Sequence, residues 1–325
     1  MVEPMLRSLA GIAVLCTAAA PMATGLAAAP CDELPARVNG HSPRELRALW
    51  RELGVRSKLF EDAVTGPLRA TRRELARPSP RESFLILDVT DSTGEDWQHL
   101  IFLRTGGRCR FVGVVDVPAQ GGEPPTHRLV SLPAGDAALA VRTLARTGTG
   151  LALHRETWYL LDLGGLERAP RTRTPPTMAL ARVLDYPARG HMVGWPSTFD
   201  RSFSTRLQGR EGADEVRIDF IASYTSGSYI YWMPVEPLFT ANRTAVYRWK
   251  RNERRFVLDP VRSDVDGDEI EGIFHDAEEQ FLQHNVRDLV PLAARANERQ
   301  RTWLRHFLDT VADSPEKRAV MENFR

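Results

Sequence analysis

A long series of short apolar segments places the strongest constraint on the fold of this chain. Between residues 67 and 261, apolar or alternating runs follow one another and are separated by clusters of Gly, Pro, Asp and Asn. Runs of this kind are typical of β-strands joined by short turns. No stretch between them is long and periodic enough for the crossover helices of a parallel sheet. The pattern therefore predicts an antiparallel system of about ten strands, either a sandwich or a strongly twisted sheet.

Residues 82–117 are the best-defined part of this series. Residues 84–89 and 100–103 are almost continuously apolar, as expected of strands that are buried on both faces. A Thr-Gly-Gly sequence ending at Gly107 then indicates a tight hairpin. In the strand that follows, alternate residues beginning with Cys109 are expected to share one face. The segment thus predicts three consecutive antiparallel strands.

A helix is predicted before the β series. Ser42 can cap it, Pro43 suits its first position, and Glu45 completes a capping box. Apolar residues then recur at helical spacing as far as Gly54, which is expected to end the helix. A stripe of this kind usually faces a core, so we expect the helix to pack on the sheet.

The period becomes helical again at residue 264 and stays so to the C-terminus. Asn297 and Ser314 are the predicted caps, and Pro315 suits the first position of the last helix. Pro291 is expected only in the first turn of its helix, because a proline farther inside removes a hydrogen bond and clashes with the preceding turn. These residues predict an appendage of short helices.

Together these signals predict an α+β protein, mainly antiparallel β, with an N-terminal helix and a C-terminal helical appendage. The expected divisions are a signal peptide at 1–27, a helical segment at 28–64, an antiparallel β domain at 65–262 and the appendage at 263–325. A hydrophobic fraction of 42% is enough for a sizeable core.

The first residues of the chain predict export. Arg7 precedes an apolar run at residues 9–20, and small residues follow that run, which is the layout of a secretory signal peptide. The peptidase needs small side chains before the cut, which favours cleavage after Ala27. A lipid anchor on Cys31 is the alternative, but Pro30 stands where a lipobox has Gly, Ala or Ser. We therefore expect an exported protein, either periplasmic or secreted.

Composition and the absence of motifs exclude several classes of function. No later run approaches the roughly 20 apolar residues that span a bilayer, so no transmembrane segment is expected. A formal net charge of +1 gives no reason to expect nucleic acid as a partner. The chain has no P-loop, no Rossmann glycine pattern, no HExxH and no GxSxG motif. No cofactor is therefore expected.

The cysteines predict one disulfide. Cys16 leaves with the signal peptide, so Cys31 and Cys109 remain in the exported chain. Two cysteines in an oxidising compartment usually pair. The bond would close a loop of about 80 residues, which stabilises the folded chain by roughly 4 kcal/mol in the chain-entropy account.

An acidic turn offers candidate metal ligands. Asp88, Asp91 and Asp96 surround Gly94, and Ca²⁺ takes several carboxylate or carbonyl oxygens from loops of this composition. The alternative interpretation is an ordinary solvated hairpin turn, which needs no ion. We expect the hairpin turn and no metal, with these aspartates as the candidates if an ion is bound.

Three residues are candidates for acid/base chemistry. His154 and Glu156 lie two positions apart on a predicted strand, so they share a face and can form an acid/base pair. His191 is a further candidate histidine. The chain has no recognisable nucleophile motif beside them, so a polar pair on the strand surface is the expected interpretation.

An aromatic run is the most suggestive binding feature. Tyr229, Tyr231 and Trp232 follow a Ser-Gly-Ser sequence, which is typical of an exposed loop. Aromatic rings stack on sugar faces or on partner side chains and lose little entropy on binding. The run predicts a binding surface for an envelope polymer or another protein, although aromatic residues in a β-rich chain also commonly fill the core.

Two hypotheses of function follow from the sequence. The first is a non-catalytic exported protein that binds a partner in the cell envelope or the extracellular space. The second is an exported hydrolase of unfamiliar type that uses a carboxylate and a histidine such as His154 or His191. The lack of a catalytic motif favours the first hypothesis.

Overall fold

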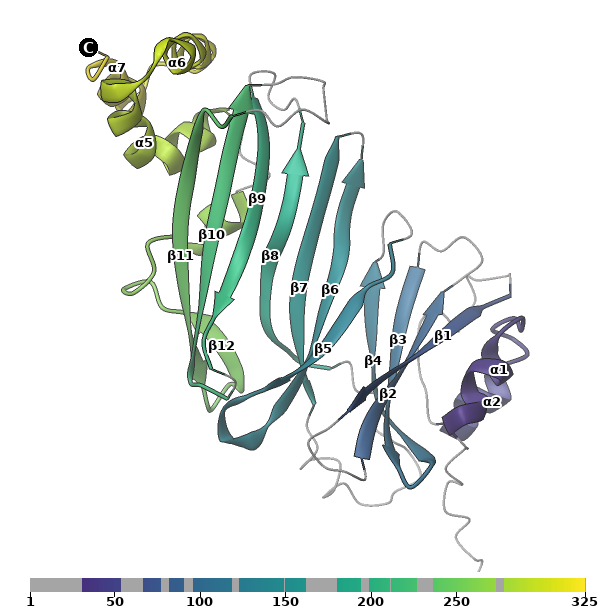
Figure 1. The fold of residues 1–325 in the computed structure, drawn as a ribbon. Coiled ribbons are helices and arrows are strands. Elements are labelled where there is room, and N and C mark those ends of the chain that lie inside the picture. The colour runs from purple at the N-terminus through teal and green to yellow at the C-terminus, as the bar shows by residue number, and fades with distance from the viewer. Residues whose placement is uncertain are drawn as a thin grey trace, which may run out of the picture.

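The computed structural model of the chain describes most residues after the predicted leader. The described ranges are 31–53, 67–76, 82–90, 96–118, 123–148, 150–161, 180–193, 199–210, 212–226, 236–272 and 278–324. Two antiparallel sheets with four and eight strands form the body, and helices lie at both ends of it (Figure 1). The prediction of a mainly antiparallel α+β protein is confirmed. None of the described helices is both long and apolar enough to cross a membrane.

The smaller sheet has its strands in sequence order. Its members are β1 (Arg69–Ala76), β2 (Glu82–Thr90), β3 (Asp96–Thr105) and β4 (Arg108–Pro118). Gly106 and Gly107 turn the hairpin between β3 and β4 with φ angles of +59° and +82°, which only glycine adopts without strain. The predicted tight hairpin is therefore present.

A β-bulge changes which residues of β4 share a face. Ile101 pairs with Gly113 while Phe102 pairs with Phe111, so one residue of β4 is extra at this point. Cys109 and Phe111 belong to the core under the N-terminal helices, whereas Val115 packs on the opposite face. The prediction of one uninterrupted face from Cys109 onward is wrong, because a bulge shifts the period of two.

The larger sheet is also a simple series of neighbours along the chain. Its members are β5 (Thr126–Ser131), β6 (Ala137–Gly148), β7 (Leu151–Leu161), β8 (Arg182–Met192), β9 (Phe199–Gln208), β10 (Glu215–Ser226), β11 (Phe239–Lys250) and β12 (Arg255–Leu258). The sheet curls strongly, since strands far apart in its order touch. The amide of Gly212 donates to the carbonyl of Ser131 at 2.9 Å, and the rings of Trp158 and Phe256 meet at 5.9 Å.

The two sheets pack face to face through one apolar layer. Phe84, Ile86, Ile101, Leu103, Val112 and Val115 of the smaller sheet meet Leu139, Val141, Tyr159 and Leu161 of the larger one. All of these side chains are buried, and each contributes roughly 2 kcal/mol to stability relative to exposure. The opposite face of the smaller sheet is buried as well, which explains the continuous apolar runs of its central strands.

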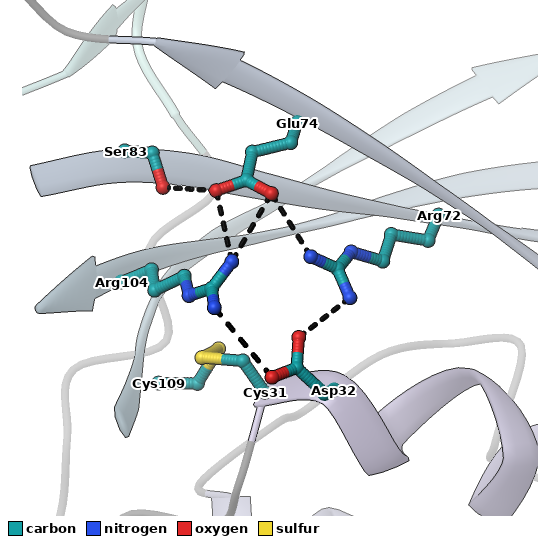
Figure 2. Close-up of a disulfide and its surroundings, with 7 residues drawn as sticks. All are labelled: Cys31, Asp32, Arg72, Glu74, Ser83, Arg104 and Cys109. Carbon is teal, nitrogen blue, oxygen red and sulfur yellow. Dashed lines mark hydrogen bonds and ion pairs between the residues drawn. A yellow bond between two sulfur atoms is a disulfide. The ribbon is translucent and has the colours of Figure 1, made fainter. Parts of the chain in front are cut away.

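The N-terminal helices cover that opposite face. They are α1 (Leu34–Val38) and α2 (Arg47–Leu53). The Ser42 amide donates to the Glu45 carboxylate at 2.7 Å, which is the hydrogen bond predicted for a capping box. It closes a turn at residues 43–46, and α2 begins after that turn, later than predicted. Cys31 and Cys109 form the predicted disulfide, which ties the start of this segment to β4 (Figure 2).

A closed ring of four charged side chains lies beside the disulfide (Figure 2). Arg72 contacts Asp32 at 2.6 Å and Glu74 at 2.9 Å, and Arg104 contacts Glu74 at 3.0 Å and Asp32 at 3.5 Å. The Ser83 hydroxyl and these arginines lower the pKa of Glu74 to about 2. Partly exposed pairs of this kind stabilise by at most about 1 kcal/mol each. The main effect of the ring is therefore to orient the segment that the disulfide holds.

Four helices follow the sheets. They are α4 (Gly267–Gly272), α5 (Glu278–Arg295), α6 (Glu298–Thr310) and α7 (Pro315–Met321), and α5 to α7 pack on the ends of β9 to β11 (Figure 1). The caps predicted at Asn297 and Ser314 are confirmed. Pro291 lies deep inside α5, contrary to prediction. Burial of Leu289 and Leu292 beside it offsets the roughly 3 kcal/mol that an interior proline costs.

The strands that prediction missed are polar ones. β1 and β9 carry several arginines and serines with few apolar residues, so their sequences lack a strong alternating pattern. Pairing with a neighbouring strand gives these segments their backbone hydrogen bonds, and a local sequence pattern does not report that pairing.

Candidate functional site

Glu156 lies on β7 and is 2% exposed. Its carboxylate accepts hydrogen bonds from Arg142 Nη2 at 2.8 Å, from Trp158 Nε1 at 2.9 Å and from Tyr186 Oη at 2.8 Å. Arg128 also donates to it at short range. Four side chains on four neighbouring strands thus surround one carboxylate, and both of its oxygens are in use.

These donors determine the charge of Glu156. Burial by itself raises its pKa, but the bond from Trp158, the charge of Arg128 and the bond from Tyr186 together bring the pKa below its usual value. Burial and the adjacent carboxylate raise the pKa of Tyr186, so its hydroxyl stays protonated and donates. Glu156 is therefore a fixed anion inside a satisfied polar cluster, and no oxygen is left to act as a base.

His154 lies on the same strand but in different surroundings. A break in register separates it from the next residue, and its Nε2 lies 3.8 Å from the carboxylate of Glu123. Burial, followed by the charge of Arg189, lowers the pKa of His154. Within the described ranges, no hydrogen bond or ion pair joins His154 to Glu156, and His191 is exposed. The structure does not gather the three candidate catalytic residues into one constellation.

Several other predicted positions fall outside the described residues. Tyr229, Tyr231 and Trp232 do, and so does Asp91, so their proposed binding roles stay predictions. Asp96 is the first residue of β3.

Asp88 is the predicted metal candidate that acquires new partners in the structure. It lies on β2, His99 lies on β3 and His127 lies on β5, and the side chains are 1%, 0% and 0% exposed. Asp88 Oδ1 is 2.7 Å from His99 Nδ1 and 3.7 Å from His127 Nε2. The two imidazole rings meet edge to face with centroids 4.6 Å apart. We call these three residues the Asp/His cluster.

Strand register explains why the Asp/His cluster forms. Asp88 pairs directly with His99, and both point to the same side as Ile86 and Ile101, which face the larger sheet. His127 reaches the same layer from β5. The cluster is therefore a polar continuation of the apolar layer between the sheets, with two members from one sheet and one from the other.

Several polar atoms in and beside the Asp/His cluster make no hydrogen bond. His99 Nε2 and both ring nitrogens of His127 are buried without a hydrogen-bond partner, and so is the hydroxyl of Thr90, which shares the face of Asp88 on β2. A buried polar atom left in this state costs about 1–3 kcal/mol. Of these nitrogens, His127 Nε2 lies 3.7 Å from Asp88 Oδ1, so an ion shared with that carboxylate would satisfy it.

Electrostatics keep His127 in the form that a metal requires. Burial, followed by the neighbouring His99 and the charge of Arg73, lowers the pKa of His127 to about 3, although Asp88 acts in the opposite direction. The ring is neutral at physiological pH and keeps a free lone pair. Metal ions bind the neutral imidazole, so no proton has to leave this ring first.

The histidines of the Asp/His cluster were not among the predicted site residues. A signal for His99 exists, because the antiparallel pairing of β2 with β3 places it opposite Asp88, and each is a polar residue beside an apolar run. No comparable signal exists for His127, since its approach depends on how the two sheets pack. One ligand atom from each of the three residues lies within 4.8 Å of the others.

Comparisons with known proteins do not place the chain in a family. No protein-family model, no curated protein and no solved structure matches it. The function must therefore be argued from the residues of this chain.

Proposed function

We propose that this chain is an exported binding protein whose ligand is a divalent transition-metal ion, held by Asp88, His99 and His127. One observation carries the proposal. Two imidazoles and a carboxylate converge in a fully buried position, and His127 Nε2, which lies 3.7 Å from Asp88 Oδ1, has no hydrogen-bond partner among the described residues. Buried polar atoms in proteins are almost always satisfied, and a metal ion shared with Asp88 would satisfy this nitrogen.

The donor set selects the class of ion. Imidazole nitrogen suits Zn²⁺, Cu²⁺, Ni²⁺ and Fe²⁺, whereas Ca²⁺ and Mg²⁺ prefer six or more oxygen ligands. Only Asp88 offers carboxylate oxygen in the Asp/His cluster. The expected ligand is therefore a first-row transition metal such as Zn²⁺, and not the calcium ion that the acidic turn suggests.

The distances are close to those of a zinc site. Ligand atoms around a tetrahedral Zn²⁺ lie about 3.3 Å apart, given metal–nitrogen bonds of about 2.0–2.1 Å. The observed separations from Asp88 Oδ1 are 2.7 Å to His99 and 3.7 Å to His127. Movements of about half an ångström bring these two separations to the tetrahedral value, and the carboxylate–imidazole hydrogen bond is then replaced by metal–ligand bonds. All three ligand atoms lie within 4.8 Å of one another, so the two imidazoles have to adjust as well.

Export is part of the proposal. The leader-like first residues and the bond between Cys31 and Cys109 support it, because disulfides persist in oxidising compartments. A Cys31 sulfur that is bonded to Cys109 cannot also carry a lipid thioether, which favours a cleaved leader over the lipoprotein alternative. The protein is then periplasmic or secreted.

A hydrolytic function is the weaker candidate. Three protein ligands and a free coordination position also occur in catalytic zinc sites. A catalytic ion must meet its substrate, however, and all three side chains of the Asp/His cluster are at most 1% exposed. Glu156, the other buried carboxylate, has no free oxygen. These observations favour binding over catalysis.

Calorimetric titration of the metal-stripped protein tests the proposal. We expect one Zn²⁺ per chain with a dissociation constant below about 1 µM, and no comparable heat with Ca²⁺ or Mg²⁺. His127→Leu should weaken zinc binding by more than about 100-fold, because it removes a direct ligand. His154→Leu is the matched control, since it removes a mostly buried histidine outside the cluster, and it should bind zinc as the wild type does. Absence of saturable zinc binding, or equal binding by His127→Leu, would contradict the proposal.

A further inference from the structure

We infer that the ion in the Asp/His cluster fastens β5, the edge strand of the larger sheet, to the smaller sheet. This inference rests on the proposed function. Asp88 and His99 belong to β2 and β3, whereas His127 belongs to β5, so one ion bonded to all three would join the sheets directly. Figure 1 shows β5 on the side of its sheet that adjoins the smaller sheet.

β5 has few attachments to the smaller sheet, because its polar links through Arg128 to Glu156 and through Ser131 to Gly212 lie within the larger sheet and its loops. It stands at the end of the strand order and has β6 as its one hydrogen-bonded neighbour among the described strands. Its outer backbone edge therefore has no ladder partner there. Val130 is the one residue of its six that is buried as a whole, backbone included, and Leu129 is partly buried against the layer between the sheets. A strand with so few buried apolar contacts opens at a low free-energy cost.

His127 is the exception within this strand, because its side chain is fully buried while most of its neighbours are not. The approach to Asp88 at 3.7 Å is too long for a hydrogen bond and leaves both ring nitrogens unsatisfied. Burial of this polar ring thus gives β5 little stabilisation by itself. A metal–nitrogen bond of about 2.0–2.1 Å would turn the same side chain into a direct attachment of the strand to the smaller sheet.

The consequence is a metal-dependent change in local stability. Any opening that moves β5 away from the smaller sheet must first break the bond to His127, so it must release the ion or leave it with two ligands. By linkage, the population of the opened form falls by the factor 1 + [M]/Kd, which is about 100 when free metal is 100 times the dissociation constant. The effect should be confined to the strands at this junction, because the ion touches no other part of the larger sheet.

Hydrogen exchange of the full exported chain tests this inference, with Zn²⁺ at 100 times its dissociation constant or with a chelator. We expect the β5 amides that bond to β6 to exchange about 100-fold more slowly with zinc. Amides of β9, β10 and β11 serve as an internal reference and should not change. Asp88→Asn, which alters a ligand on the opposite sheet, should abolish the slowing at β5.

The outcomes separate this inference from the proposed function. If zinc binds but β5 exchanges at the same rate with and without it, the fastening role is wrong and the metal site stands. Equal slowing throughout the larger sheet would also overturn the inference, because it would indicate global stabilisation without a local attachment. If calorimetry detects no zinc binding, the proposed function and the inference both fall.

Discussion

Glu156 and Asp88 are both buried carboxylates, but their hydrogen bonding differs. Glu156 is 2% exposed and Asp88 is 1% exposed, and each lies on a strand. Glu156 accepts hydrogen bonds from four side chains, including two arginines. Asp88 has a single hydrogen-bonded imidazole, and Arg73 lies 3.6 Å from its other oxygen. One carboxylate is fully satisfied, and the other is surrounded by unused lone pairs.

The location of the partners explains the difference. All donors to Glu156 come from β5 to β8 of one sheet, so strand pairing alone brings them together. The partners of Asp88 come from two sheets, and their meeting depends on how those sheets pack. The comparison supports our proposal that the Asp/His cluster binds an ion, whereas the Glu156 cluster has the contacts of a structural element.

The largest expected effect is on stability at the satisfied carboxylate. Glu156→Gln should lower the free energy of unfolding by about 3 kcal/mol, because it removes the charge that Arg128 and Arg142 share and leaves donors without a full acceptor. Chemical denaturation with and without zinc measures this. The loss of unfolding free energy should be the same with and without zinc. A loss that appears in only one condition would contradict the view that the Glu156 cluster and the Asp/His cluster act independently.

The loss of stability in acid should depend on the protonation of Glu156. The pKa of Glu156 lies below its usual value of 4.5 in the folded state, so the unfolded chain binds the proton first as the pH falls. Its contribution to stability is complete above about pH 4.5 and is lost as the pH falls through the lower folded-state pKa. The unfolding free energies of the wild type and Glu156→Gln should therefore become equal as the pH falls. A difference between them that stays constant with pH would contradict this.

A substitution in the Asp/His cluster should have the opposite effect and stabilise the metal-free protein. In metal-free protein, His127→Leu should raise the free energy of unfolding by about 1 kcal/mol, because it replaces two unpaired buried nitrogens with an apolar side chain of similar size. With zinc present the order should reverse, since only the wild type gains binding energy. Thermal denaturation with zinc and with a chelator measures both. A destabilised metal-free variant would show that His127 already has a structural role without an ion.

The smallest expected effect concerns the charge next to Asp88. Arg73 is partly exposed, and its guanidinium competes with a cation for the carboxylate. Arg73→Gln should tighten zinc binding by about threefold, in keeping with the modest energies of exposed ion pairs. Arg69→Gln on the same strand is the control, and its affinity should match that of the wild type. Weaker binding by Arg73→Gln would mean that this arginine orients Asp88 for the ion.

Much of the fold was predictable because its determinants are local. Capping residues such as Asn297 and Ser314 and the Gly-Gly hairpin each act within a few positions of the chain, and the structure contains them all. The disulfide followed from compartment and cysteine number. Polar strands such as β9 and the interior Pro291 were missed, because strand pairing and core packing override the local preference at those places.

The candidate site was only partly predictable. Asp88 was recognised as a possible ligand but was placed in a solvated turn, whereas the structure buries it between the sheets. His99 follows from Asp88 once the hairpin register is known. His127 is separated from both by an entire strand and a change of sheet, so only the tertiary arrangement brings it to the Asp/His cluster.

X-ray absorption spectroscopy of the zinc-loaded protein tests the central claim most directly, because it reports the atoms bound to the ion. The account predicts a first shell of nitrogen and oxygen at about 2.0–2.1 Å, with outer-shell scattering from two imidazole rings. His127→Leu, loaded at higher zinc, should lose the contribution of one ring. A first shell without imidazole scattering would show that any bound zinc lies elsewhere, and it would contradict a metal centre formed by Asp88, His99 and His127.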